Sequence, residues 1–200
     1  VSGGHTQIVK VESTNKMVVI GTTIDDAAGE AFDKSAKILK LPYPGGPLID
    51  KYSNKGNIHA FKFGKPKVKD LDFSFSGLKT SILYKIKGNL QNNPNFIEEN
   101  LKDLCASIQH SIVFILIDKI EKAIQKTGIK EIAISGGVSA NSYLRTELQN
   151  LADQKNYNLY IPKFQYCTDN AAMIAISGYF KYINKDFVNQ EETSSASLIF

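Results

Sequence analysis

Two Gly-Gly turns near opposite ends of the sequence have the residue types of a backbone anion-binding site. Ser2-Gly3-Gly4 opens the chain, and Gly136-Gly137 follows the apolar run 132–134. Glycines let backbone N–H groups approach a ligand without an intervening Cβ, and the first turn of a following helix adds unpaired donors and the positive end of a dipole. A phosphate or a carboxylate would fit such a turn. An ordinary connection between a strand and a helix has the same composition, so each turn by itself leaves both interpretations open.

The hydrophobic spacing predicts which elements hold the two turns. The β-branched run 132–134 and the helical spacing that begins at Asn141 predict a strand, a tight turn and a helix. The first turn leads into alternating apolar residues over 6–11, and the run 17–21 predicts the next strand. Two such turns on separate strands can face each other across a cleft. This pairing resembles the phosphate-binding turns of the actin, sugar-kinase and Hsp70-like ATPases.

A row of carboxylates is predicted beside these turns. We expect the polar residues 22–26 to cap a helix on which Asp26, Glu30 and Asp33 share one face. One interpretation is a solvated acidic stripe, with Glu30 and Lys34 as an ion pair one turn apart. The other is a row that binds ribose hydroxyls or a metal. The spacing of the residues is compatible with both.

Two irregular stretches follow this helix. Three prolines surround a Gly-Gly pair in 41–47, which predicts a stiff loop, and a helix is expected to restart at Leu48. In 61–69, basic residues interleave with apolar ones. The lysines are Lys62, Lys65, Lys67 and Lys69, and the apolar residues between them are Phe61, Phe63 and Val68. A nucleic-acid or phosphate surface fits this pattern, and a hairpin with one charged face in water fits it equally well.

The middle of the chain is predicted to contain the core. Ser76-Gly77 can begin a helix whose first turn would meet an anion, although the spacing is not that of a Walker loop. Apolar residues on one stripe predict a buried helix over 96–126, ended by Gly128. A strand is expected at 157–161.

The last helix carries one further candidate ligand. Thr168 is predicted to cap this helix, and Asp169 stands at its positive end. Asp169 either complements the helix dipole or serves as a metal ligand at a junction between a strand and a helix. The tail, residues 184–197, is polar and is predicted to be mobile.

Composition places the chain among globular proteins. Its 200 residues are 42% hydrophobic, and a net charge of +4 is compatible with a nucleic-acid partner without requiring one. Two cysteines without CxxC spacing predict free thiols in a reducing compartment and argue against a disulfide framework or a zinc ribbon. The longest apolar run, 112–117, is too short to span a bilayer, and no signal peptide is visible. We therefore predict a soluble, cytoplasmic chain with no membrane partner.

Six stretches spread over nearly the whole chain form one pattern. They are SGGHTQ at 2–7, DDAAGEAFDK at 25–34, YPGGP at 43–47, FSFSGLKT at 73–80, GGVSAN at 136–141 and CTDN at 167–170. In order and spacing they resemble the TsaD family, the tRNA threonylcarbamoyladenosine transferases formerly called O-sialoglycoprotein endopeptidase or glycoprotease. The resemblance implies transfer of a threonylcarbamoyl group from threonylcarbamoyl-AMP, made by another enzyme, to N6 of the adenosine just 3′ of the anticodon in tRNA.

The resemblance also implies a fold and its division. The fold is an α/β, actin-like ATPase (ribonuclease H-like) fold, of which this chain would be mainly the second lobe with a partial first lobe. Residues 1–24 would be a remnant of the first lobe, 25–166 the ligand-binding second lobe, and 167–200 a helix and tail that return toward the first lobe. The implied partners are tRNA, a paralogous TsaB-like subunit and a TsaE-like ATPase.

The residues that match the family's binding positions can be named. For the adenylate they are Val1, Ser2, Gly3, Gly4, Asp33, Gly46, Asp50 and Asn141. The family's metal, usually iron and sometimes zinc, is held by two histidines of an HxxxH motif and by an aspartate, whose position Asp169 occupies. By this resemblance Asp33 accepts hydrogen bonds from ligand hydroxyls, and the metal polarises the threonylcarbamoyl carbonyl group. No side chain is identified as a catalytic base.

The chain departs from the family in its histidines. His5, His59 and His110 include no pair with HxxxH spacing. Because one carboxylate holds a transition metal weakly, we expect the 200-residue chain alone not to modify tRNA. It begins with Val1 inside a strand–turn motif, so we expect a piece of a longer protein that lacks most of the first lobe. Apolar surface exposed in this way would favour self-association.

Two other functions remain open at this point. One is an actin-like sugar or acetate kinase lobe, which would need an aspartate base near a sugar pocket. The other is a non-catalytic partner-binding module of the same fold, like the family's degenerate paralogue. A peptidase has no support, because neither an HExxH motif nor a pair of nucleophile and base is visible.

Overall fold

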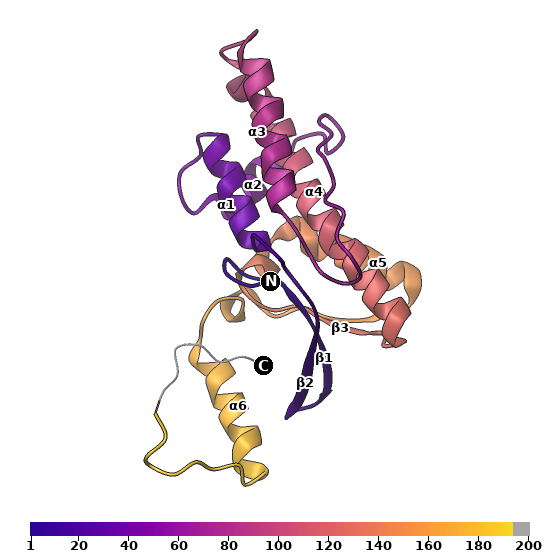
Figure 1. The fold of residues 1–200 in the computed structure, drawn as a ribbon, viewed down its shortest axis with the longest axis vertical. Coiled ribbons are helices and arrows are strands. Elements are labelled where there is room, and N and C mark those ends of the chain that lie inside the picture. Colours follow the sequence, from indigo (N-terminus) through magenta and orange to yellow (C-terminus); the bar gives the residue numbers. More distant parts are fainter. Residues whose placement is uncertain (194–200) are drawn as a thin grey trace.

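The chain combines long helices with short strands, and the computed structural model describes residues 1–193. In chain order the elements are β1 (Gln7–Ser13), β2 (Lys16–Thr22), α1 (Ala28–Ile38), α2 (Gly45–Ser53), α3 (Ser76–Leu90), α4 (Phe96–Thr127), β3 (Glu131–Ala133), the 3-10 helix η1 (Gly137–Ala140), α5 (Ser142–Lys155), β4 (Asn158–Tyr160), the 3-10 helix η2 (Phe164–Tyr166) and α6 (Ala171–Ile183). The strands lie below a layer formed by α1 to α4, and α6 extends away from that layer (Figure 1).

Helix α4 is the centre of the hydrophobic core. Helices α1, α2, α3 and α5 all pack against it. Leu104, Ile108 and Ile112, spaced by four residues on one stripe, are fully buried. Gly128 ends the helix in the left-handed conformation, with φ of 72°, and its N–H donates to the Ile124 carbonyl oxygen. The predicted core helix and its glycine end are confirmed.

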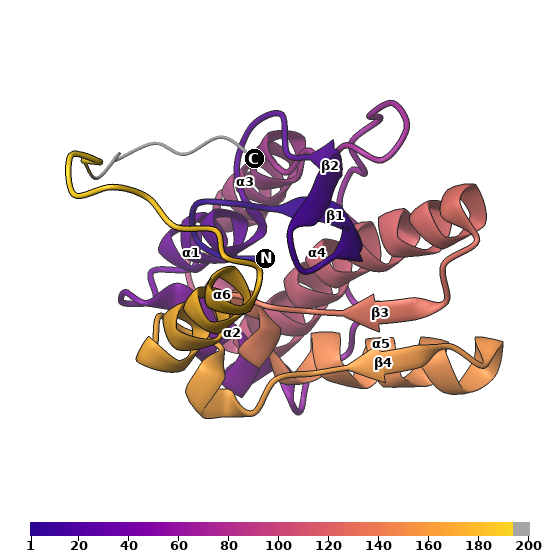
Figure 2. The same ribbon diagram turned by 90° about the horizontal axis from the view of Figure 1, so that it is seen from below.

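Two separate two-stranded sheets form in the described residues. β1 and β2 confirm the two strands predicted near 6–11 and 17–21 and pair as an antiparallel hairpin, with irregular register between Ile8 and Val9 and again between Val11 and Ser13. β3 and β4 pair in parallel and are joined by α5, so this part of the chain is a βαβ unit (Figure 2). The strand, turn and helix predicted around Gly136-Gly137 are therefore confirmed, with η1 inserted before α5.

Residues 57–70 form no strand, so the predicted alternative of a charged hairpin at 61–69 is wrong. We call this segment the strap, because it runs in irregular conformation along α4 and α3. Its backbone is held by side chains instead of a partner strand. The N–H groups of Phe61 and Gly64 donate to the hydroxyls of Ser107 and Ser81. The buried Lys119 ammonium donates to the carbonyl oxygens of Val68 and Asp70.

Two helix starts differ from the prediction because their caps come from distant residues. Residues 22–26 do not cap α1; its first N–H, on Ala28, donates to Oγ1 of Thr6 at 2.8 Å. Helix α2 begins at Gly45 and not at Leu48. Asp33 Oδ1 accepts the N–H groups of Gly45 and Gly46 at 2.8 and 3.2 Å, and this carboxylate stabilises a helix start inside the predicted loop.

Helix α6 exposes its apolar residues. Its cap is Asn170, whose side chain accepts the Met173 N–H, so the predicted cap at Thr168 is wrong. The helix buries no residue within the described chain, and Ile174 and Tyr182 are each 68% exposed. Residues 184–193 of the predicted polar tail are exposed, and 194–197 lie outside the described residues. The expected self-association and the division at residues 24 and 166 stay predictions.

Helices within residues 1–193 are all too short or too polar to cross a membrane. Both cysteines are free, as predicted, and both are buried.

Candidate nucleotide-binding site

The two Gly-Gly turns lie next to each other, as predicted. The Val1 nitrogen donates to the Ser135 carbonyl oxygen at 2.9 Å, and the Val138 N–H donates to the Val1 carbonyl oxygen at 3.2 Å. The next residue contacts the start of α1, since the Gly29 N–H donates to the Ser2 carbonyl oxygen at 3.0 Å. The first turn therefore lies between the second turn and the N-terminus of α1.

The glycines of this region fall into two groups by what a Cβ would meet. Gly136 has φ of 87°, and a Cβ there would overlap the Val1 carbonyl oxygen. A Cβ on Gly29 would lie 2.7 Å from the Ser2 carbonyl oxygen. These two glycines let backbone segments pack closely. Gly3, Gly4 and Gly137 are different: a Cβ on any of them would have no neighbour within 4 Å.

Ser2 and Thr6 fix the shape of the first turn. Ser2 Oγ accepts the N–H groups of Gly4 and His5 at 3.3 and 3.0 Å. Thr6 is fully buried, and its hydroxyl accepts the first N–H of α1. The positive end of the α1 dipole is thus next to a turn whose glycines are open to solvent, which is an arrangement that suits an anion.

Asp25 joins two motifs that are fifty residues apart. Its carboxylate accepts hydrogen bonds from the hydroxyls of Ser74 and Ser76 at 2.5 and 2.7 Å, and from the N–H groups of Phe75 and Ser76. Burial raises the pKa of Asp25, but these hydrogen bonds outweigh it, so the pKa lies below its usual value. The charged carboxylate therefore caps α3 and ties its start to the residues before α1.

The acidic row divides into two parts. Asp26 and Glu30 form ion pairs with Lys34 at 2.6 and 2.8 Å, which confirms the predicted pair on the surface of α1. The hydrogen bonds that the Lys34 ammonium donates to these two carboxylates raise the pKa of Lys34. Asp33 points elsewhere and caps α2. Its second oxygen, Oδ2, takes part in no hydrogen bond within residues 1–193.

Three of the predicted ligand residues cap helices in one connected network. Asp33 caps α2, and Asp50 on α2 accepts the N–H and hydroxyl of Ser142 at the start of α5. Asn141 Oδ1 accepts the Leu144 N–H at 2.8 Å, while its amide donates to Gln109 on α4 at 2.7 Å. These side chains link α1, α2, α4 and α5 around the two glycine turns.

Comparison with known proteins decides between the open interpretations. Residues 1–176 match the sequence model of the TsaD family, described as tRNA N6-adenosine threonylcarbamoyltransferase. The chain belongs to the TsaD family. A protein of that name from Christiangramia forsetii is 59% identical over 200 residues, which cover all of this chain and 59% of the relative. One from Riemerella anatipestifer is 56% identical over 196 residues, covering 98% of this chain and 58% of the relative. The chain thus spans about three fifths of the length of these relatives.

A solved structure shows the fold independently of close sequence similarity. Full-length HypF, crystallised in a phosphate- and nucleotide-bound form, superposes with a TM-score of 0.58 at 16% identity, over 79% of this chain and 20% of HypF. The mixed α/β architecture of this TsaD chain is consistent with the expected actin-like fold.

The metal expected for a TsaD chain does not fit the described residues. Within 1–193, no three His, Cys, Asp or Glu side chains are close enough to hold an ion together. Asp169 is exposed, and a single carboxylate is a weak site for a transition metal. His110 Nδ1 lies 2.9 Å from the Tyr143 hydroxyl, and its ring centroid is 5.5 Å from that of His59. These two histidines belong to α4 and the strap.

Arg145 connects the Asp169 segment to the second glycine turn, and the sequence gives no signal for this role. Its Nε donates to the Ser139 carbonyl oxygen at 2.7 Å. Its Nη2 donates to the carbonyl oxygen of Pro162 at 2.8 Å and to the Cys167 sulfur at 3.2 Å. A hollow of about 620 Å³ is lined by Arg145 and other residues of α5 and by residues 161–164, and no residue of the glycine turns lines it.

Proposed function

We propose that this chain supplies the adenylate-binding part of a tRNA N6-adenosine threonylcarbamoyltransferase. The reaction transfers the threonylcarbamoyl group of threonylcarbamoyl-AMP to N6 of the adenosine just 3′ of the anticodon. The single observation that carries the proposal is the family match over residues 1–176. The adjacency of the two glycine turns, which the chain brings together from positions more than 130 residues apart, supports it.

The two turns would hold the adenylate by its phosphate. A Cβ on Gly3, Gly4 or Gly137 would meet nothing within 4 Å, and the N-terminus of α1 is beside the first turn. The Gly4 N–H donates to Ser2 Oγ, whereas the N–H groups of Gly3 and Gly137 take part in no hydrogen bond within residues 1–193 and are the donors available to a ligand. In the transfer, a bond forms between N6 and the carbamoyl carbon, and the bond from that carbon to the phosphate oxygen breaks. AMP leaves and N6 loses a proton. Negative charge that develops on the phosphate would be stabilised by these donors.

Asp33 would orient the ligand through its hydroxyls. Oδ1 accepts the N–H groups of Gly45 and Gly46 at the start of α2, so these hydrogen bonds hold the Asp33 carboxylate in one orientation. Oδ2 then accepts hydrogen bonds from the ligand. Gly46, Asp50 and Asn141 would complete the wall of the site, since each is part of the same capping network.

The proposal includes partners outside the chain. Iron or zinc would need ligands in addition to Asp169, and no step above depends on the metal. The TsaB-like subunit, the TsaE-like ATPase and a cytoplasmic location are proposed from the family membership alone.

The test is direct. The intact protein, given tRNA and threonylcarbamoyl-AMP, should produce N6-threonylcarbamoyladenosine, detected by mass spectrometry of the digested tRNA. A tRNA with guanosine in place of the target adenosine is the control and should remain unmodified. Sugar-dependent ATP turnover without any modified nucleoside would contradict the proposal and favour a kinase.

A further inference from the structure

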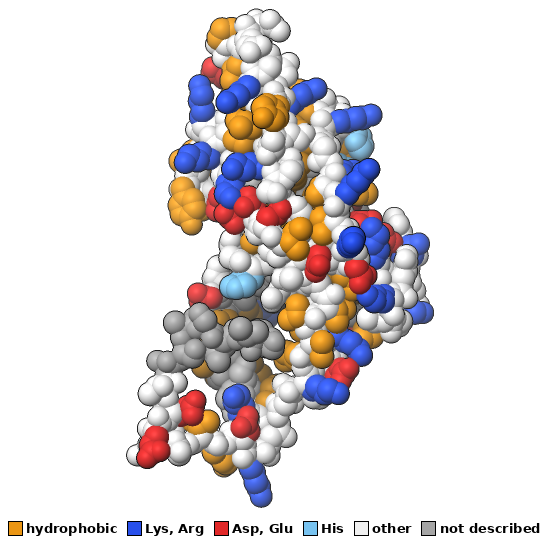
Figure 3. Space-filling model, viewed as in Figure 1, with side chains coloured by type: hydrophobic (Ala, Val, Ile, Leu, Met, Phe, Trp, Pro, Cys, Tyr) orange, Lys and Arg blue, Asp and Glu red, His pale blue; other side chains and the backbone are white. Residues whose placement is uncertain are grey.

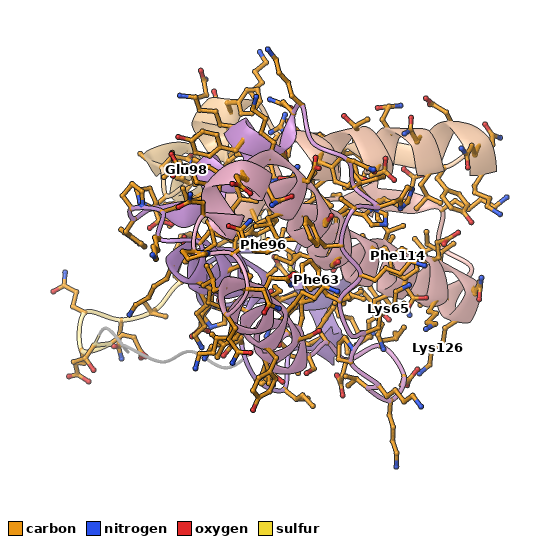
Figure 4. The ribbon with its side chains drawn as sticks, turned by 90° about the horizontal axis from the view of Figure 1, so that it is seen from above. Phe63, Lys65, Phe96, Glu98, Phe114 and Lys126 are labelled. Atoms are coloured by element: carbon orange, nitrogen blue, oxygen red, sulfur yellow. The ribbon has the colours of Figure 1, made fainter. Side chains whose placement is uncertain are left out.

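The strap, residues 57–70, runs along α4 in the same chain direction as the helix. Successive strap residues contact successive turns of that helix over most of its length. The pairs are Asn57 with Asp103, Phe61 with Ser107, Lys65 with Phe114, Val68 and Asp70 with Lys119, and Asp70 with Lys126. Figure 4 shows Phe63 and Lys65 on the strap, with Phe114 and Lys126 of α4 beside it. Held at so many points, the strap presents a fixed outer edge.

That outer edge is basic. Lys62, Lys65, Lys67 and Lys69 are all exposed, whereas Phe61, Phe63, Pro66 and Val68 are partly buried. The Lys65 ammonium lies 3.5 Å from the centroid of the Phe114 ring, an interaction that leaves the charge at the surface. None of the ion pairs found within residues 1–193 involves these four lysines. Four positive charges therefore face solvent without a carboxylate partner.

Helix α3 extends this basic surface to the candidate site. The Gly64 N–H donates to Ser81 Oγ at 2.8 Å, so the strap and α3 are side by side. No acidic residue occurs between Asp72 and Glu98, while α3 carries Lys79, Lys85 and Lys87. Figure 3 shows lysine side chains, in blue, distributed over the part of the molecule that α3 and the strap form.

The position of α3 relates this surface to the chemistry. Its first residue, Ser76, is bonded to Asp25, directly before α1 and the glycine turns. At 1.5 Å per residue, Lys85 and Lys87 lie about 14 and 17 Å along the helix from that start. An RNA whose target base enters the site would thus have its backbone beside α3 and the strap.

We propose that the strap and α3 bind the backbone phosphates of the tRNA. This inference rests on the proposed function. Unpaired ammonium groups on a fixed, extended edge suit a polymer with one charge per nucleotide, and they read no sequence. The surface would hold the RNA while the adenylate-binding turns act on a single base.

The experiment measures tRNA binding by the intact protein at several salt concentrations. The test variant is Lys62→Gln/Lys67→Gln/Lys69→Gln, which spares Lys65 and its contact with Phe114. Loss of three phosphate contacts should reduce the slope of log K against log salt by about 2 and weaken binding about 50-fold at 0.15 M salt.

The matched control removes the same charge from other surfaces. Lys16→Gln/Lys155→Gln/Lys181→Gln changes three exposed lysines on β2, α5 and α6, and should keep the wild-type slope. Arginine at positions 62, 67 and 69 should restore binding, and affinity for an analogue of threonylcarbamoyl-AMP should be unchanged in all three variants.

Each outcome has one meaning. A strap variant that binds tRNA like the control overturns this inference and leaves the proposed function standing. A strap variant that also loses the adenylate analogue overturns it too, because the effect is then not specific to RNA. Failure of the wild-type protein to bind or modify tRNA refutes the proposed function itself.

Discussion

Gly136 and Gly137 are neighbours in sequence, yet replacing each with alanine should have opposite effects. At Gly136 the backbone has φ of 87° and ψ of 169°, a region that is almost confined to glycine. A Cβ there would also overlap the Val1 carbonyl oxygen. At Gly137, φ is not positive and a Cβ would meet nothing within 4 Å. Stability should therefore depend on the first glycine, and ligand binding on the second.

The magnitudes separate the two variants clearly. Backbone strain of about 1–3 kcal/mol, together with displacement of the Val1 segment, should cost Gly136→Ala about 3 kcal/mol of unfolding free energy. For a chain of this size that corresponds to a Tm lower by roughly 6–12 °C. Gly137→Ala should leave Tm within about 2 °C of the wild-type value. The alanine reduces the conformational entropy of the unfolded chain and introduces no steric clash in the folded chain.

Binding reverses the order of the two effects. The methyl group of Gly137→Ala would occupy the space where a phosphate approaches the backbone, so affinity for a non-hydrolysable analogue of threonylcarbamoyl-AMP should fall by at least about tenfold, or 1.4 kcal/mol. Calorimetric titration of the intact protein measures this, and Gly88→Ala on α3, where a Cβ also has open space, is the control. Wild-type affinity in Gly137→Ala would refute the assignment of the glycine turns, and an unchanged Tm in Gly136→Ala would refute the packing argument.

Three further outcomes are expected. Asp25→Asn should cost about 1 kcal/mol at pH 7 after allowance for solvent screening. Because the folded pKa of Asp25 is lowered, the difference from wild type should begin to shrink as pH falls below about 4 and should vanish below the folded pKa, measured by urea unfolding across pH. Lys119→Met should leave two strap carbonyls without their donor, cost about 2 kcal/mol and speed amide exchange over 62–70. The 200-residue chain alone, given tRNA, the adenylate and iron or zinc, should yield no modified nucleoside, because residues 1–193 contain no group of three metal-ligating side chains.

The sequence predicted correctly those elements whose conformation depends on residues close to one another in the chain. The stripe of α4, its end at Gly128 and the hairpin of β1 and β2 depend on residues a few positions apart. The predicted starts of α1 and α2 were wrong because the groups that cap these helices are distant in the sequence. Thr6 caps α1 from 22 positions away, and Asp33 caps α2 from 12 positions away. A rule that searches the preceding residues for a cap cannot find them.

The candidate site shows the same division. The residue types of the two glycine turns are enough to predict them. That they lie close together is expected because two such turns on separate strands can face each other. The strap was recognised as basic and aromatic, but its conformation depends on Lys119, a buried lysine about 50 residues later in the sequence. Arg145, which bonds to three separate segments, has no sequence pattern that distinguishes it from a surface arginine.

The caps also indicate where a bound phosphate would be placed. Three helix starts, those of α2, α3 and α5, have a carboxylate as a hydrogen-bond acceptor, from Asp33, Asp25 and Asp50 respectively. Each of these carboxylates offsets the positive end of its helix. The α1 start differs in degree. Its first N–H is accepted by the neutral hydroxyl of Thr6, and its one carboxylate acceptor, Glu30, accepts the Ala27 N–H at the longer distance of 3.4 Å and is also paired with Lys34. Of these four helix ends, the α1 end beside Gly3 and Gly4 is therefore the least compensated, and an adenylate phosphate should bind there in preference to the other three.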